Sequence, residues 1–363
     1  MKRSRKKYGQ AGGVQLVEMP VALDKNLIGD FRDLQALLYK QNQATQFFQS
    51  FIKFWDEHRQ IFQIDPTLCQ ALANTEIEDV PWEALRLPHP EFYISFGDYG
   101  QDSFAIRDLH YIIDGAYIRH VPQASALFPN DTLLITFTSR LVYPSYKEAR
   151  DERAVQGFHF SEPIYDYAIS GAGSPTIGEA ITKGESEYRG YCRRLDDNLH
   201  RAATDWASEA DVLPFGDRIC PHEEKFDRGK AIILPSVPVL FNAIFYLTHK
   251  PESHQETYPK TAPVQQVQDL HKTTSPYIRK SILDSLARKG FSKVTFVRDP
   301  ELSESLESLP TGRTVRAHWR RGHWRHQPYG KGLSLRKWVW ILPVLVKKEE
   351  EFSLGTIHDV HNQ

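Results

Sequence analysis

The first hydrophobic pattern along the chain has the spacing of helices. In residues 30–40 and again in 47–62, apolar side chains recur every three or four positions, which places them on one helical face. Asp65-Pro66 is expected to end the second helix, because the residue before a proline disfavours helical dihedral angles. We therefore predict a helical hairpin within residues 23–80. Its aromatic stripe is interpreted as core, with a groove for a partner as the alternative.

Beyond about residue 80 the spacing changes to the alternation that is typical of strands. Runs rich in β-branched and aromatic residues predict four short strands, at residues 91–97, 111–119, 132–138 and 155–160. Asp114-Gly115 stands between two apolar runs and predicts a hairpin turn. Together these features predict a central antiparallel sheet rather than alternating βαβ units.

Longer apolar stripes predict the helices that cover this sheet. They are expected from Ser174-Pro175 to about Ala207, at about 237–248, and from Ser275-Pro276 to Gly290, the last followed by a strand at 293–297. The middle helix lies in an uncharged run that contains two prolines and is short for a membrane span, so we interpret it as buried and predict no contact with membranes. The glycine-rich residues 170–178 lack the spacing of a phosphate-binding loop.

The predicted fold class is therefore α+β. It combines an N-terminal helical hairpin, a central antiparallel sheet with covering helices, and a C-terminal basic β-hairpin. The expected units are a basic flexible tail at 1–22, the helical hairpin at 23–80, and an α+β domain at 81–363 that carries a candidate insertion at 186–230 and the basic hairpin at 313–347.

Charge is distributed very unevenly along a chain whose formal net charge is only -1. Residues 311–348 contain ten Lys or Arg and no Asp or Glu, and the first ten residues contain five more basic side chains and no acid. The rest of the chain is therefore strongly acidic. No apolar run follows the basic start, so it does not predict a secretory signal. The three cysteines, Cys69, Cys192 and Cys220, are widely separated, which favours a reducing, cytoplasmic location.

The basic stretch 314–330 also has the alternation of a strand. Val315, Ala317 and Trp319 fall on one side, and a bulge at Arg321-Gly322 would return Trp324 to that side, since glycine tolerates a bulge. The predicted binding row on the other side comprises Arg316, His318, Arg320, Arg321, His323, Arg325 and His326. The residues expected to support it are Trp319, Gly322, Trp324, Tyr329 and Trp340. A return strand, 335–346, is expected inside the fold, with Pro343 at a bulge or in an unpaired position.

Three interpretations of this row compete. It is a recognition surface for an acidic ligand such as RNA, or a structural network that pairs with the acidic remainder, or a metal-independent ribonuclease site in which His318 and His323 act as acid and base while Arg320 holds phosphate. We predict no metal site and no cofactor, because Cys220-x-His222 lacks a second pair at zinc-like spacing.

The same stretch carries a family resemblance. The pattern Arg316-x-His318-x-Arg320-Arg321-Gly322-His323-Trp324, a turn with glycine, and then Trp340-x-x-Pro343-x-x-Val346 resembles the C-terminal signature of the second family of type V-A anti-CRISPR proteins, whose relatives occur on bacterial plasmids and phages. Weaker similarity extends upstream to about residue 85, whereas the N-terminal hairpin and residues 186–230 do not match.

This resemblance implies inhibition of CRISPR immunity by blocking production of the type V-A effector nuclease. The family acts during translation, which implies as partners the nascent effector polypeptide, its mRNA and the ribosome, in the cytoplasm of a bacterial host. It implies no catalytic residue and no small-molecule cofactor. We therefore expect a binding protein rather than an enzyme.

Overall fold

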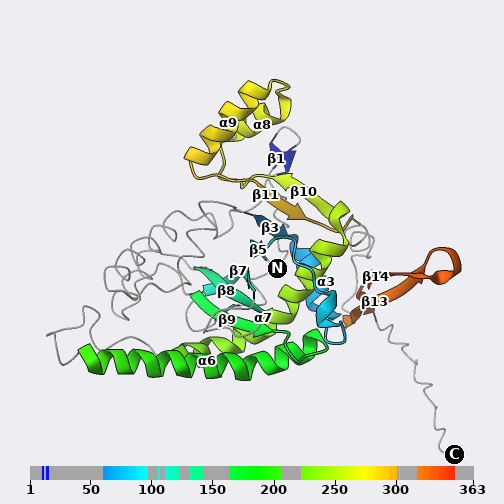
Figure 1. Ribbon diagram of the computed structural model, residues 1–363. Coiled ribbons are helices and arrows are strands. Elements are labelled where there is room, and N and C mark those ends of the chain that lie inside the picture. Colours follow the sequence, from blue (N-terminus) through cyan, green and yellow to red (C-terminus); the bar gives the residue numbers. More distant parts are fainter. Residues whose placement is uncertain are drawn as a thin grey trace, which may run out of the picture.

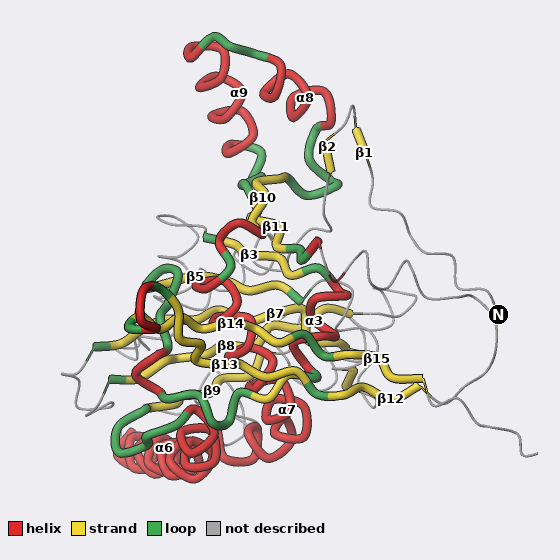
Figure 2. Tube along the Cα trace, turned by 90° about the vertical axis from the view of Figure 1, so that its right-hand side faces the viewer, coloured by secondary structure: helices red, strands yellow, loops and turns green. Residues whose placement is uncertain are grey.

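The structure, a computed structural model, describes residues 10–11, 14–15, 60–96, 105–106, 111–122, 131–141, 164–206, 222–300, 302 and 317–347. Its centre is an eight-stranded sheet in the order β10-β11-β3-β5-β7-β8-β9, with β6 beside β7 (Figures 1 and 2). The strands are β3 (Ile61–Ile64), β5 (Glu91–Ser95), β6 (Ala105–Ile106), β7 (Tyr111–Val121), β8 (Thr132–Leu141), β9 (Ile164–Ser170), β10 (His254–Thr257) and β11 (Val294–Val297). A separate two-stranded pair is formed by β1 (Gln10–Ala11) and β2 (Val14–Gln15).

Helices lie along and beyond this sheet, so the α+β class is confirmed. They are α3 (Pro66–Ala73), α6 (Ile177–Trp206), α7 (His222–His249), α8 (Val264–Lys272) and α9 (Pro276–Arg288), with short 3-10 turns at Trp82–Ala84 and Pro251–Ser253. No described helix combines the length and the apolar character that crossing a membrane requires.

The sheet is mixed, which corrects the expectation of an antiparallel one. Strand β3 runs parallel to both of its neighbours, β5 and β11, while the other pairings are antiparallel. Ile61 and Phe62 fall within the predicted second helix, but they belong to β3, all four residues of which are buried. A short apolar run has no hydrophobic periodicity that distinguishes a buried strand from a helix. In this protein, pairing within the sheet makes the run a strand. Residues 23–59 of the predicted hairpin lie outside the described residues.

Asp65-Pro66 begins a helix instead of ending one. The Asp65 carboxylate accepts hydrogen bonds from the backbone N–H groups of Thr67 (2.9 Å) and Leu68 (3.4 Å), and Pro66 occupies the first turn of α3. Proline is well suited to this position because its missing N–H would have no partner there. The same two residues thus separate β3 from α3.

Asp114-Gly115 is not a hairpin turn, because β7 continues through it with a bulge between Ile113 and Gly115. The buried Tyr93 hydroxyl donates to the Asp114 carboxylate at 2.6 Å, which gives the displaced residue a partner inside the protein. Burial and the nearby carboxylate raise the pKa of Tyr93 well above its ordinary value. A Cβ at Gly115 would lie 2.1 Å from the Ile94 carbonyl oxygen, so only glycine fits.

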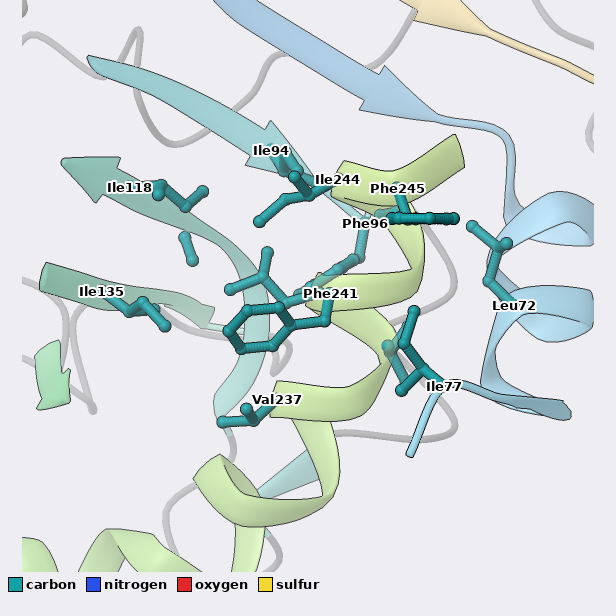
Figure 3. Packing of buried hydrophobic residues seen from close by; sticks show 14 of the residues in the cluster. Leu72, Ile77, Ile94, Phe96, Ile118, Ile135, Val237, Phe241, Ile244 and Phe245 are labelled. Atoms are coloured by element: carbon teal, nitrogen blue, oxygen red, sulfur yellow. The ribbon is translucent and has the colours of Figure 1, made fainter. Parts of the chain in front are cut away.

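Helix α7 forms the core together with one face of the sheet. Val237, Phe241 and Ile244 point toward apolar side chains of β5, β7 and β8, among them Ile94 and Ile118 (Figure 3). Leu72 and Ile77 close the other side of this cluster (Figure 3). The helix begins at His222, well before the expected start near 237, and contains Pro235 and Pro238.

The first turns of α7 are joined to α6 by ion pairs. Arg189 contacts Asp227 through both guanidinium nitrogens (2.8 and 3.1 Å), and Arg193 contacts Glu223 (2.7 Å). These pairs run in opposite chain directions, so α6 and α7 are antiparallel. Arg189 also holds the pKa of Asp227 well below its usual range. Residues 186–230 therefore include the contact between two long helices.

The other helix boundaries follow local signals closely. Helix α9 begins at Pro276 and is followed by Gly290 in a left-handed conformation (φ 83°), as predicted. Helix α6 ends at Trp206, one residue from the expected end. Its start differs, because Thr176 rather than Ser174 accepts the capping bond, from the Glu179 N–H at 3.2 Å.

Replacing Gly115 with alanine should lower the free energy of unfolding by about 2 kcal/mol or more, since the new methyl group must displace backbone. Gly190 is the matched control, because a Cβ there meets only the flexible Arg194 side chain at 3.6 Å. Gly190→Ala should stabilise helix α6 by roughly 0.5–1 kcal/mol. Chemical denaturation of both variants tests the close approach, and equal stabilities would contradict it.

Candidate recognition surface on the C-terminal ribbon

The basic C-terminal segment forms a two-stranded ribbon that projects from the body of the protein (Figure 1). Its strands are β12 (Ala317–Arg320), β13 (Gly322–Tyr329), β14 (Leu335–Ile341) and β15 (Val344–Lys347). Strand β12 pairs with β15 and β13 with β14, both antiparallel. The turn between β13 and β14 contains a 3-10 segment, Lys331–Leu333, with Gly330 and Gly332 at positive φ. This turn lies at the far end of the ribbon.

The ribbon is interrupted, but its register does not change. The pairs Arg320/Val344 and His323/Ile341 have the same offset, so two residues are left out on each strand. The bulge expected at Arg321-Gly322 is therefore a symmetric gap. Pro343, on the opposite strand, is unpaired as predicted, because it has no N–H to donate. The Gly322 N–H donates instead to the Asn74 carbonyl at 2.9 Å.

Glycine is required at this gap because the two strands approach closely. A Cβ on Gly322 would lie 2.7 Å from the Ile341 carbonyl oxygen and 2.8 Å from Cδ of Pro343. The freed edge of β13 pairs in parallel with β4 (Thr75–Glu76), which directly follows α3. The ribbon is thus joined to the body by backbone pairing.

A buried amide fixes this junction. The Asn242 side chain on α7 is fully buried, and its Nδ2 donates to the carbonyls of Leu72 (3.0 Å) and Thr75 (2.8 Å). Its Oδ1 accepts from Nε1 of Trp324 at 2.8 Å. Both Nδ2 protons are therefore used. One side chain connects α7, the end of α3, strand β4 and the ribbon.

A second indole repeats the arrangement. Trp340, directly opposite Trp324 in the register, donates from Nε1 to the Thr75 hydroxyl at 3.1 Å, and that hydroxyl donates to the Ala71 carbonyl. The two indole rings lie 6.2 Å apart at 25°. Phe245 packs edge-on against Trp324 at 4.7 Å, and Tyr246 against Trp340 at 5.2 Å. The inner face of the ribbon near the gap is therefore part of the core.

The opposite face of the ribbon carries the polar side chains. We call this the outer face; by alternation it comprises His323, Arg325, Gln327 and Tyr329 of β13 and Leu335, Lys337, Val339 and Ile341 of β14. Arg325 donates to Gln327 Oε1 at 2.7 Å, and the Lys337 ammonium lies 5.5 Å from the Tyr329 ring centre. The outer face thus combines cations, an aromatic ring and exposed aliphatic carbon.

The structure brings together only part of the predicted binding row. His323 and Arg325 share the outer face, whereas His326 lies on the inner face, where its ring stacks on Trp338 at 4.7 Å. Arg320 and Arg321 are exposed beside the gap. His318 and Trp319 are described only as backbone positions in β12, and Arg316 lies outside the described residues.

Ion pairs involve little of this row. Among the described residues, Arg321 with Glu76 is the one ion pair made by Arg320, Arg321 or Arg325, at 3.2 Å. Its side chains are 72% and 50% exposed, so it contributes little to stability. This geometry does not favour the interpretation of the row as an internal charge network.

The two histidines proposed as an acid–base pair are far apart along the ribbon. His318 and His323 occupy positions five residues apart in strands whose register is continuous, which separates their Cα atoms by roughly 16 Å. An acid and a base that act on one phosphate must both come within hydrogen-bonding reach of it. The described residues also contain no cluster of His, Cys, Asp and Glu that could hold a metal ion.

The sequence interpretation missed the tip of the ribbon. Strand β14 was expected to be inside the fold, but Leu335, Arg336 and Lys337 are exposed, as are Lys331 and Leu333 in the turn. The signal was present in the sequence, since charged residues adjoin the glycine-containing turn.

The family model described as "Anti-CRISPR type V subtype A2 family", AcrVA2-like, matches residues 62–348. The chain belongs to this family. The match begins in β3 and ends just after β15, so it includes the central sheet and the whole ribbon. Membership in the AcrVA2-like family indicates an anti-CRISPR function and, with it, an interaction with a CRISPR effector system.

A crystal structure of AcrVA2 aligns with 89% of this chain and 88% of its own length, at 13% identity and a TM-score of 0.36. Similarity at that level adds nothing to what the family match gives. No protein with curated annotation matches the sequence.

Replacing Asn242 with leucine should lower the free energy of unfolding by about 2–4 kcal/mol, because a substitution of similar size leaves two carbonyls and an indole N–H buried without partners. The ribbon should also become more sensitive to limited proteolysis. Arg325→Ala, on the exposed outer face, should change stability by less than about 0.5 kcal/mol. If Asn242→Leu were as stable as the parent protein, the buried amide would not be the anchor.

Acidification should weaken the docking of the ribbon through His249. Its half-buried ring stacks on Phe245 at 4.1 Å and lies 6.1 Å from Trp324. Burial lowers the pKa of His249, although a hydrogen bond to the Phe245 carbonyl partly opposes this. The unfolded chain therefore binds the proton more readily, and stability falls as the pH drops below about 6.5. Unfolding at about pH 7.5 and about pH 5.5 should show a smaller acid-induced loss in His249→Phe than in the parent; an equal loss would exclude His249 as the cause.

Proposed function

We propose that this chain suppresses production of a type V-A CRISPR nuclease in the cytoplasm of a bacterial host. In this proposal it recognises the nascent effector polypeptide, its mRNA or both on the outer face of the ribbon, and it acts by binding rather than by catalysis. The observation that carries the proposal is the outer face itself. It is a basic, exposed surface that is held in position by a buried anchor, and it lies within the residues that the family model matches.

The outer face is suited to an extended chain with acidic or planar groups. The Arg325 guanidinium can bind carboxylate or phosphate oxygens through two parallel hydrogen bonds. Tyr329 offers a ring for stacking, and Val339 and Ile341, opposite Arg325 and His323 in the register, add half-buried apolar contacts. Such a surface can hold either an unfolded peptide segment or unpaired nucleotides.

Backbone pairing is also available to a peptide. Within the part of the chain that the structure describes, β14 is an edge strand, paired with β13 on one side only. An exposed strand edge can take up an extended peptide by main-chain hydrogen bonds, while alternate side chains provide specificity. A polypeptide emerging from the ribosome is extended and unfolded, so it fits this mode. The ribosome is the place where this peptide and its mRNA occur together.

The ribonuclease interpretation gains no support from the geometry. The separation of His318 and His323 along the ribbon and the stacking of His326 on Trp338 leave no two described histidines at one place on the outer face. Binding is therefore the function that we assign to this surface.

Two altered effector genes test which molecule is recognised. A synonymously recoded gene keeps the polypeptide and changes the mRNA, whereas a gene with compensating frameshifts near its start keeps most of the mRNA and changes the first residues of the polypeptide. If the peptide is recognised, suppression should persist with the first gene and disappear with the second; recognition of mRNA predicts the reverse. Effector mRNA and protein are measured in cells with and without this chain, and no change in either for the natural gene would contradict the proposal.

Reversing the charge of Arg325 should weaken suppression at least about fivefold, because an arginine contact at such an interface is worth about 1–3 kcal/mol. Arg336→Glu is the matched control, since it makes the same charge change on the same ribbon but on the inner-face register. It should leave suppression within about twofold of the parent. Equal loss in both variants would indicate an effect of net charge and not of the outer face.

A further inference from the structure

A second basic surface lies far from the ribbon. Helices α8 and α9 form a small unit inserted between β10 and β11, and the turn that joins them is at the end farthest from the sheet (Figures 1 and 2). The two strands that flank it pair directly with one another, so a two-stranded hairpin carries a long helical insertion. The insertion is folded as two helices, so it is a structural unit of its own and not a loop.

This unit has its own apolar cluster, separate from the main core. Tyr258, Ala262, Val267, Leu270 and Leu286 are buried in it. The cluster accounts for how the two helices hold each other. It does not account for the apolar residues that remain outside at the tip of the unit.

The tip has an unusual surface. Every residue from Pro276 to Ser281 is exposed, and Tyr277 has an exposed fraction of 83%, the largest among the exposed large hydrophobic residues. Within the described residues, the Tyr277 ring contacts no other aromatic ring and its hydroxyl makes no hydrogen bond. Ile278 is 50% exposed beside it. An exposed aromatic ring at the end of a projecting unit offers a face on which a planar group can stack.

Charge identifies the chemistry of that partner. Residues 258–293 contain seven Lys or Arg and two Asp, within a chain whose net charge is -1. Arg279 and Lys280 directly follow Tyr277 and Ile278 and make no ion pair among the described residues; Arg279 uses one N–H to reach the Leu270 carbonyl at 3.3 Å. Lys280, about one helical turn from Tyr277, and Arg279 in the same turn of α9 are cations near an exposed ring, which match a phosphate backbone with unpaired bases.

We propose that the tip of the α8–α9 unit binds single-stranded RNA, with a base stacked on Tyr277 and neighbouring phosphates held by Arg279 and Lys280. In this proposal the hydroxyl groups of Thr274 and Ser275, in the turn just before α9, hydrogen-bond the 2′-hydroxyl of ribose. This site adds to the proposed function but does not rest on it, because it is measured on the pure protein without any effector.

The test uses the full chain and a fluorescently labelled, unstructured oligouridine RNA in an anisotropy titration. Tyr277→Ala should weaken binding about tenfold, the factor expected for one lost base–aromatic stack, whereas Tyr277→Phe keeps the ring and should bind like the parent. Arg279→Glu with Lys280→Glu should weaken binding at least as much. This double variant should also reduce the slope of log affinity against log salt concentration by about 1.4, because it loses two phosphate contacts and each accounts for about 0.7.

The matched control reverses Arg288 and Lys289, which make the same charge change at the opposite end of the same helix. It should weaken binding much less than the tip variants. Thermal melting of each variant confirms that it is folded, and the exposure of Tyr277 makes a loss of stability unexpected. The proposal is overturned if oligouridine does not bind, if Tyr277→Ala binds like the parent, or if both charge reversals act equally.

Two further arms decide the class of ligand. If polyglutamate displaces the RNA as well as unlabelled RNA does, the tip is a site for acidic protein segments and the proposal is wrong. If single-stranded DNA of the equivalent sequence binds more tightly than the RNA, the hydroxyl groups of Thr274 and Ser275 do not recognise the 2′-hydroxyl of ribose. RNA is then not the ligand. Loss of suppression in Arg325→Glu with RNA binding intact would separate the two surfaces.

Discussion

A single buried amide is the constraint on which the rest of the ribbon depends. Asn242 is fully enclosed, so each of its polar atoms must find a partner within the protein. It finds them on three different elements, and this is possible only when α3, β4 and the ribbon are all in position. A partly satisfied buried network is costly, so the arrangement favours one geometry strongly over its alternatives.

This anchor explains how a very basic segment can belong to a folded core. Tryptophans satisfy the inner face through packing and indole hydrogen bonds, and Arg325 and His323 remain in water on the outer face. These charged side chains therefore do not belong to a flexible tail. They project from paired strands, which set the spacing between them. Preorganisation of this kind reduces the entropy lost when a partner binds.

Local signals in the sequence predicted those features that local chemistry decides. Ser275-Pro276 and Gly290 bound α9, Pro343 is unpaired, and strand alternation placed Trp324 inside with His323 and Arg325 outside. Features that depend on distant partners were missed. Asp114 sits in a bulge because Tyr93 bonds to it, and β3 is a strand because β5 and β11 flank it. The symmetric gap in the ribbon likewise depends on Asn74, more than two hundred residues before Gly322 in the sequence.

The parallel pairing of β13 with β4 joins Thr75 to Gly322, two residues that are translated far apart in time. Strand β3 has the same property, because its neighbour β11 is made more than two hundred residues later. Contacts of such high sequence separation form slowly and only once both partners have left the ribosome. The early segments α3 and β4 therefore exist for some time with their apolar sides unoccupied, and the outer face acquires its shape at the last stage of synthesis. A cell would accumulate active protein only from chains completed at least through β15.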